Sequence, residues 1–101
     1  MGIIEFVFGG KKHKIQDYIK RNAIILDVRT QREWQKGHIK NAVHIPLNEL
    51  RGRMDEIKQK SQPVIVYCKS GVRSYRASKF LKSNNIDATN GGGWQSLKNK
   101  L

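Results

Sequence analysis

"PVIVYCKSGVRS", residues 63–74, gives the clearest indication of the fold, because an apolar run of strand length leads directly into a short loop and a helical pattern. Near-continuous apolar runs rich in β-branched residues are typical of strands buried on both faces, as in parallel sheets. A second run of this kind is "AIILDV", residues 23–28. Shorter strand candidates are "AVHI", residues 42–45, which Pro46 ends, and "DAT", residues 87–89.

Helical patterns lie between these runs. Thr30 and Glu33 fit a capping box and Gly37 fits a helix end, so residues 30–37 are predicted to form a short helix. Apolar residues at helical spacing predict further helices over residues 14–20, 47–57 (weakened by Gly52) and 94–101, and after the loop that follows Cys68. Strands that alternate with helices predict an α/β fold with a mainly parallel sheet.

The chain has 20 Lys and Arg against 8 Asp and Glu, a formal net charge of +12, which favours anionic partners. The basic residues are scattered from Lys11 to Lys100, without an arginine-rich tract or a long basic tail. A solvated basic surface is therefore the simpler interpretation, and nucleic acid is not the expected partner. A small anionic substrate would also be attracted by this charge.

A length of 101 residues fits a single domain with one modest core. No apolar run approaches the ~20 residues that a membrane-spanning helix needs. The opening, "MGIIEFVFGGKK", places its apolar stretch before its basic residues, the reverse of a secretory signal. One cysteine cannot form an internal disulfide, which is compatible with a reducing compartment. We therefore expect a cytoplasmic protein.

Two parts of the chain are distinguished by pattern. Residues 1–13 form an N-terminal segment of uncertain structure, in which "IIEFVF", residues 3–8, suits a strand or a helix equally well. Its apolar side chains are expected to pack on the domain, because exposed apolar clusters are uncommon on monomers. Residues 14–101 are predicted to form the domain itself.

Cys68 is expected at the carboxyl end of its strand, where ligands bind in open α/β sheets. Gly71 lets the following loop turn tightly, so that several backbone N–H groups are able to point at the sulfur. The start of the next helix and the side chains of Lys69, Arg73 and Arg76 add positive potential. Each effect favours the thiolate, which is the nucleophilic form of cysteine, and would also attract an oxyanion.

The residues alone leave alternatives open for Cys68. A lone cysteine is often a buried small hydrophobe. A cysteine protease would need a histidine base, and none of His13, His38 and His44 is placed beside Cys68 by the sequence. A cysteine phosphatase would use a comparable anion cradle. One cysteine and three dispersed histidines show no zinc spacing, so neither a metal nor a cofactor is expected.

Three segments, spread over about residues 24–97, together resemble the rhodanese family. "LDVRTQREWQKGHIKNAVHIPL" is similar to the family's Asp-x-Arg … Glu-aromatic … Gly-His-Ile … Ala … Ile-Pro segment. "VIVYCKSGVRS" resembles its active loop, Cys-x-x-Gly-x-Arg-Ser, and "GGGWQSL" resembles the glycine-rich stretch and tryptophan near its end. Four residues separate Cys68 from Arg73, which resembles the sulfur-transferring branch; related phosphatases carry one more.

The resemblance implies a rhodanese-like α/β fold with a parallel sheet of about five strands and helices on both faces. It also implies a thiosulfate sulfurtransferase, which would move a sulfane sulfur from thiosulfate or a similar anionic donor to cyanide or a thiol through a Cys68 persulfide. A sulfur-accepting protein is a further expected partner. The alternative is a sulfur-carrier or interaction module with little turnover by itself. The substrate-binding loop would comprise Lys69, Ser70, Gly71, Val72, Arg73 and Ser74, with Cys68 as the catalytic residue.

Other marked residues are interpreted as structural. Asp27, Arg29 and Glu33 are expected to make polar contacts that fix the first loop, and His38 to be an oriented structural histidine. The two tryptophans are interpreted as core or loop anchors, and the glycines at 91–93 as a tight turn near the active loop.

Overall fold

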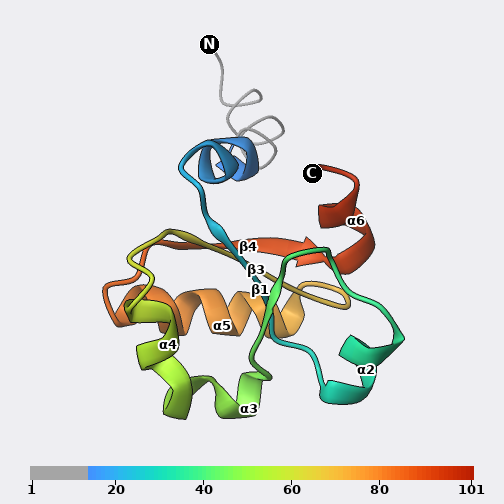
Figure 1. Ribbon diagram of the computed structural model, residues 1–101, viewed down its shortest axis with the longest axis horizontal. Coiled ribbons are helices and arrows are strands. Elements are labelled where there is room, and N and C mark those ends of the chain that lie inside the picture. Colours follow the sequence, from blue (N-terminus) through green and yellow to red (C-terminus); the bar gives the residue numbers. More distant parts are fainter. Residues whose placement is uncertain (1–13) are drawn as a thin grey trace.

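The computed structural model describes residues 14–101, so the predictions for residues 1–13 lie outside the described part. The described residues form a parallel four-stranded sheet in the order β2-β1-β3-β4 (Figure 1). The strands are β1 (Ile24–Asp27), β2 (Val43–His44), β3 (Val64–Cys68) and β4 (Ala88–Gly93). The α/β fold is confirmed, and the strand count is close to the five or so that we expected.

The central strand β3 explains why its sequence is apolar almost throughout. It pairs with β1 on one side and β4 on the other, and all five of its residues are buried. Val64, Val66 and Cys68 contribute to the core on one face of the sheet, whereas Ile65 and Tyr67 contribute to the core on the other. A strand covered on both faces has no position for a polar side chain.

Helices cover both faces of this sheet (Figure 1). One face carries α5 (Val72–Ser83), with α3 (Leu47–Leu50) and α4 (Met54–Lys58) beside it. The other face is covered by the helical residues 14–20 and by α6 (Trp94–Lys98), through Ile15, Tyr18 and Leu97. The remaining helix, α2 (Gln31–Lys36), follows β1. Within residues 14–101, no helix combines the length and the apolar character that crossing a membrane would require.

The prediction of one continuous helix over residues 47–57 is wrong. The segment is divided into α3, the 3₁₀ turn η1 (Arg51–Arg53) and α4. The break lies at Arg53, whose φ of −119° and ψ of 19° leave the helical region. Leu50, Met54 and Ile57 are nevertheless buried, because both short helices still direct their apolar residues toward α5 and the sheet.

The fourth strand is longer than the predicted residues 87–89. It extends through the three glycines to Gly93, with a register irregularity opposite Val66 and Tyr67. A Cβ at Gly91 would lie 2.8 Å from the Ile65 Cγ2 atom and 3.0 Å from the Leu97 Cδ2 atom. Close packing between the sheet and α6 therefore requires glycine at this position of the strand.

Candidate active site

Cys68 ends β3, and residues 69–71 connect it to the start of α5. Gly71 has a φ of 104°, a conformation that other residues rarely adopt, and this directs its N–H at the Cys68 sulfur over 3.0 Å. From the first turn of α5, Ser74 brings its N–H to 3.4 Å and its hydroxyl oxygen to 3.3 Å from the same sulfur. The expected cluster of donors around the sulfur is thus present in the structure.

These donors determine the protonation state of Cys68. Burial raises the pKa of the thiol, but hydrogen bonds from the Ser74 hydroxyl and from the N–H groups of Ser74, Gly71 and Ser70 outweigh it, so the pKa lies below its ordinary value. Cys68 is only 1% exposed, whereas Lys69, Ser70 and Val72 above it are exposed. The sulfur therefore lies at the bottom of a polar cup formed by residues 69–72 and Ser74. A thiol that served only as a buried apolar group would need no such hydrogen-bond donors.

Asn90 of β4 holds this cup together, and the sequence analysis missed it. Its Nδ2 donates to the carbonyl oxygen of Gly71 over 3.0 Å, and its Oδ1 accepts from the Gly92 N–H over 2.9 Å. The same Oδ1 lies 2.7 Å from the Ser74 hydroxyl. Because a hydroxyl carries one proton, Ser74 shares it between Asn90 and the sulfur. The one signal in the sequence is a polar residue inside a strand directly before three glycines.

The glycines of β4 let its backbone approach the loop closely. A Cβ at Gly93 would lie 2.6 Å from the carbonyl oxygen of Lys69, and one at Gly71 would lie 3.3 Å from the Gly92 Cα atom. Gly92 itself has a φ of 87°. The glycine stretch thus combines strand pairing with a close approach to the loop, where we had expected only a tight turn.

Arg73 is joined to the first loop instead of to the sulfur. Its guanidinium donates to both carboxylate oxygens of Glu33, over 2.7 and 2.9 Å. Glu33 also completes the predicted capping box with Thr30, which is confirmed. The hydrogen bonds from Arg73 are the main cause that lowers the pKa of Glu33 to about 2. This pair ties the start of α5 to the start of α2.

A buried ion pair lies beneath this region. Asp27 and Arg29 are 0% and 3% exposed, and the guanidinium Nη2 lies 2.7 Å from the carboxylate. The same nitrogen donates to the carbonyl oxygen of Gly37 over 2.7 Å, and the guanidinium lies over the Trp94 ring at 4.6 Å. The contacts fix the segment between β1 and α2, as expected for Asp27 and Arg29.

The histidines of the described residues do not pair with Cys68. His38 and His44 stack on Trp34, with ring centroids 3.4 and 4.7 Å away. Each donates one ring N–H hydrogen bond: His38 to the carbonyl oxygen of Trp34 over 2.9 Å, and His44 to that of Arg29 over 2.8 Å. His13 lies outside the described residues. Within residues 14–101, therefore, the geometry offers no histidine base of the kind that a cysteine protease uses.

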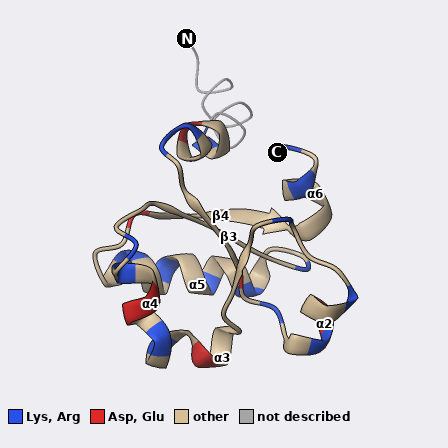
Figure 2. Cartoon of the chain, in the orientation of Figure 1, with Lys and Arg blue, Asp and Glu red and all other residues tan. Residues whose placement is uncertain are grey.

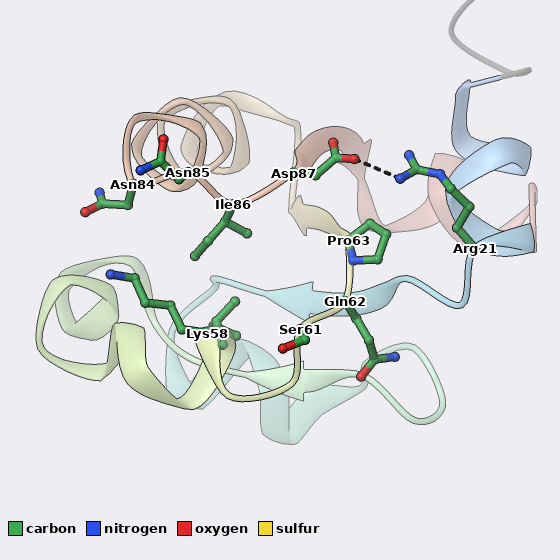
Figure 3. A pocket seen from close by; sticks show the side chains of 10 residues that line it. Arg21, Lys58, Ser61, Gln62, Pro63, Asn84, Asn85, Ile86 and Asp87 are labelled. Carbon is green, nitrogen blue, oxygen red and sulfur yellow. Dashed lines mark hydrogen bonds and ion pairs between the residues drawn. The ribbon is translucent and has the colours of Figure 1, made fainter.

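A hollow of about 600 Å³ lies at the other end of the sheet, where β3 and β4 begin (Figure 3). Arg21 and Asp87 at its border form an ion pair of 2.8 Å, drawn as a dashed line, and Lys58 projects on the opposite side. Cys68 and the hydrogen-bond donors around its sulfur are all at the carboxyl end of the strands. The hollow therefore does not contribute to the chemistry of Cys68.

Comparison with known proteins agrees with this geometry. The family model described as Rhodanese-like domain matches residues 12–100. A sulfurtransferase of Allochromatium vinosum is 38% identical over 60 residues, covering 59% of this chain and 55% of the relative. YrkF of Bacillus subtilis, named as a candidate sulfur carrier protein, is 41% identical over 58 residues, covering 57% of this chain and 31% of the relative. The chain thus spans only about a third to a half of these curated relatives.

Among solved structures, a rhodanese-related protein of Thermoplasma volcanium superimposes with a TM-score of 0.72 at 31% identity, and the match covers 88% of each chain. The superposition and the family match over residues 12–100 agree. The chain belongs to the rhodanese-like domain family.

Proposed function

We propose that this protein is a sulfurtransferase that moves a sulfane sulfur from thiosulfate, or a similar anionic donor, to cyanide or a thiol. The observation that carries the proposal is the convergence of polar hydrogens from Ser70, Gly71 and Ser74 on the Cys68 sulfur. Such an arrangement stabilises negative charge on the sulfur before and after it reacts. The relatives named as a sulfurtransferase and as a candidate sulfur carrier support the same chemistry.

The reaction has two steps. The Cys68 thiolate attacks the outer sulfur of thiosulfate; an S–S bond forms, the S–S bond of the donor breaks, and sulfite leaves with the bonding electron pair. The acceptor then attacks the outer sulfur of the Cys68 persulfide, and the electron pair of that S–S bond returns to the Cys68 sulfur. Neither step needs a general acid, because sulfite and the thiolate are stable anions. This is covalent catalysis by an activated nucleophile.

The loop residues have different parts in this proposal. The N–H groups of Ser70, Gly71 and Ser74 would hold the charge of the thiolate and of the persulfide. Lys69 is exposed at the rim, where its ammonium group would attract an anionic donor. Val72 is the first residue of α5. We had expected Arg73 to contact the anionic sulfur donor; it would instead act through its positive charge while it remains paired with Glu33. A cytoplasmic location, with reduced thiols as acceptors, belongs to the same proposal.

Intact mass spectrometry tests this function directly. After incubation with thiosulfate and removal of the excess, the protein should gain the mass of one sulfur atom and lose it on addition of cyanide. A Cys68→Ser variant is the matched control and should gain nothing. An unchanged mass of the reduced wild-type protein would refute the sulfurtransferase proposal.

A sulfur-carrier role is the second candidate, and the 1% exposure of Cys68 favours it. A sulfur so deeply placed would exchange slowly with small donors unless a partner opened the loop. In that case the persulfide would form slowly with thiosulfate, and turnover with cyanide would remain slow at every donor concentration. Fast multiple turnover by the isolated chain would exclude this role.

A further inference from the structure

A groove lies between α3 and α5, the helix that follows Cys68 and its loop. Its volume is about 280 Å³, and its lining consists of Leu47, Leu50, Arg51, Arg76 and Phe80. Leu47, Leu50 and Phe80 form the apolar part of this lining. The guanidinium of Arg51 lies over the Phe80 ring, 5.6 Å from its centroid. Small-molecule pockets usually start at about 300 Å³. This groove therefore suits one or two side chains of a partner better than a whole ligand.

The groove and the active loop share the helix α5. Val72, Arg76 and Phe80 follow one another at intervals of four residues along α5, so they lie on the same face of the helix. Arg76 is only about 6 Å along the helix axis from Val72, which adjoins the loop. Val72 and Tyr75 are 63% and 52% exposed, and no packing in the described residues explains two large apolar side chains left open beside a reactive cysteine.

Two cations line this groove, Arg51 and Arg76, and two more, Lys69 and Lys79, lie in the active loop and on α5. Arg51, Lys69, Arg76 and Lys79 form no ion pair with an acidic residue of the described part. Arg73, in contrast, already forms an ion pair with Glu33, so its guanidinium is less available to an acidic partner. Figure 2 shows blue bands along α5, whose sequence contains no acidic residue. The four unpaired cations therefore provide a field that an acidic partner would complement.

We propose that the groove between α3 and α5 docks an acidic, extended segment of a partner protein and presents a cysteine of that segment to the Cys68 persulfide. This inference rests on the proposed function and names its acceptor. An apolar side chain of the segment would enter the groove between Arg51 and Arg76. Since an extended chain advances about 3.4 Å per residue, the accepting cysteine would lie two or three residues away from that side chain. The apolar lining distinguishes this partner from a nucleic acid, whose phosphates need cations alone.

The transfer step leaves the electrons balanced. The partner's thiolate, having released its proton to water, attacks the outer sulfur of the Cys68 persulfide. A new S–S bond forms on the partner, and the old one breaks with its electron pair on the Cys68 sulfur. The partner leaves as a persulfide and Cys68 returns to the thiolate, so no oxidant or reductant is consumed.

The first experiment measures transfer from the preloaded persulfide to two synthetic peptides of equal length. Each contains one leucine and a C-terminal cysteine amide three residues later; one is otherwise composed of Asp and Glu, the other of Lys. The acidic peptide should accept sulfur at least about tenfold faster at low salt, and the difference should shrink as salt screens the charges. Equal rates for the two peptides would overturn the proposal. Cyanide as the acceptor shows separately whether the persulfide is competent.

Charge-reversal variants locate the effect. Arg76→Glu should remove most of the preference for the acidic peptide. Lys58→Glu makes the same charge change at the end of α4, in the hollow where α5 ends, and should retain the preference. Equal loss of preference in both variants would show a general effect of net charge and would refute docking in the groove. The measured quantity is the ratio of the two peptide rates, which does not depend on the basal reactivity of Cys68.

A binding experiment tests the surface even without sulfur transfer. The acidic peptide with its cysteine replaced by serine should bind the unloaded protein, and replacing its leucine by serine should weaken binding at least about fivefold, because the apolar contact is lost. A peptide that binds equally well without leucine would contradict the role of the groove. Displacement of the bound peptide by a single-stranded oligonucleotide of equal charge, at equal concentration, would instead indicate a nucleic-acid site and overturn the inference.

Discussion

The hydroxyl group of Ser74 provides a quantitative test of how the loop controls the Cys68 thiol. Replacing Ser74 by Ala removes one of the donors around the sulfur, at 3.3 Å, and leaves the backbone N–H groups in place. A hydrogen bond to a charged group is worth about 1.5–3 kcal/mol. Here the proton is shared with Asn90 at 2.7 Å, so we take about 1 kcal/mol, below that range.

The expected effect on titration follows from this value. Since about 1.4 kcal/mol corresponds to one pKa unit, Ser74→Ala should raise the pKa of Cys68 by about 0.7. At a pH below the pKa, the thiolate fraction would fall about fivefold, and the higher intrinsic nucleophilicity of a more basic thiolate would reduce the loss in rate to about two- to threefold. The chain contains one cysteine and three tyrosines. The thiolate absorbance reports on Cys68 alone once the same titration of Cys68→Ser, which carries the tyrosine contribution, has been subtracted.

Two matched variants make the result decisive. Ser78→Ala removes a buried hydroxyl one turn further along α5, which donates to the carbonyl oxygen of Tyr75 and not to the sulfur, so the pKa of Cys68 should not change. Ser74→Thr keeps a hydroxyl and should retain most of the wild-type value. A pKa that stays constant or falls in Ser74→Ala, or that rises equally in Ser78→Ala, would refute the assignment of Ser74 as a donor to the sulfur.

Three further predictions concern the surroundings of the loop. Glu33→Gln should destabilise the protein by about 1–2 kcal/mol near neutral pH, because the pKa of Glu33 is lowered to about 2 chiefly by Arg73. The contribution should be lost as the pH falls from the ordinary carboxylate range through about 2. Urea unfolding at several pH values measures it, and a plot of wild-type stability against pH that runs parallel to that of the variant would be the contrary result. Gly93→Ala should lower the free energy of unfolding by about 1–3 kcal/mol, because its Cβ would lie 2.6 Å from a backbone oxygen. Gly52→Ala, with open space around it, should be neutral or stabilising. Thermal unfolding compares the two variants, and equal melting temperatures would contradict the close approach at Gly93. Asp27→Ala should cost about 3–5 kcal/mol, since its buried arginine partner would lose its counter-charge; a loss below about 1 kcal/mol in chemical denaturation would indicate that water compensates the charge.

The parts of the site that follow from local patterns were predictable from the sequence. The apolar run before Cys68 indicated a buried strand, and the small residues after it indicated a loop with several free N–H groups. Thr30 and Glu33 indicated a capping box, because both partners lie within one turn of the chain. Each of these features depends on residues that are close together in the sequence.

The parts that depend on tertiary pairing could not be predicted. Ser74 and Asn90 are 16 positions apart, and their contact requires β3 and β4 to pair with Val66 opposite Asn90. The Arg73–Glu33 pair joins residues 40 positions apart. It engages the Arg73 side chain, which the sequence suggested as a contact for the anionic sulfur donor. Alternating hydrophobicity can specify a register, but β3 is buried on both faces and has no such alternation, so its sequence does not show which residue of β4 lies opposite Val66.

The break in the helix over residues 47–57 has a different cause. Leu50, Met54 and Ile57 satisfy helical spacing whether the helix is continuous or divided, because the short turn between the two parts keeps their apolar sides facing the core. Periodicity therefore predicted burial correctly and continuity wrongly. Gly52 gave the one local signal, since glycine weakens a helix interior.

Titration of the wild-type Cys68 thiol tests the central claim most directly. Thiolate absorbance is followed against pH in the folded protein and in the same protein unfolded by urea, which provides the reference for this cysteine. The account predicts a folded pKa clearly below the unfolded value of about 8.5, because the donors from the loop and from Ser74 outweigh burial. A folded pKa equal to or above the unfolded one would contradict it.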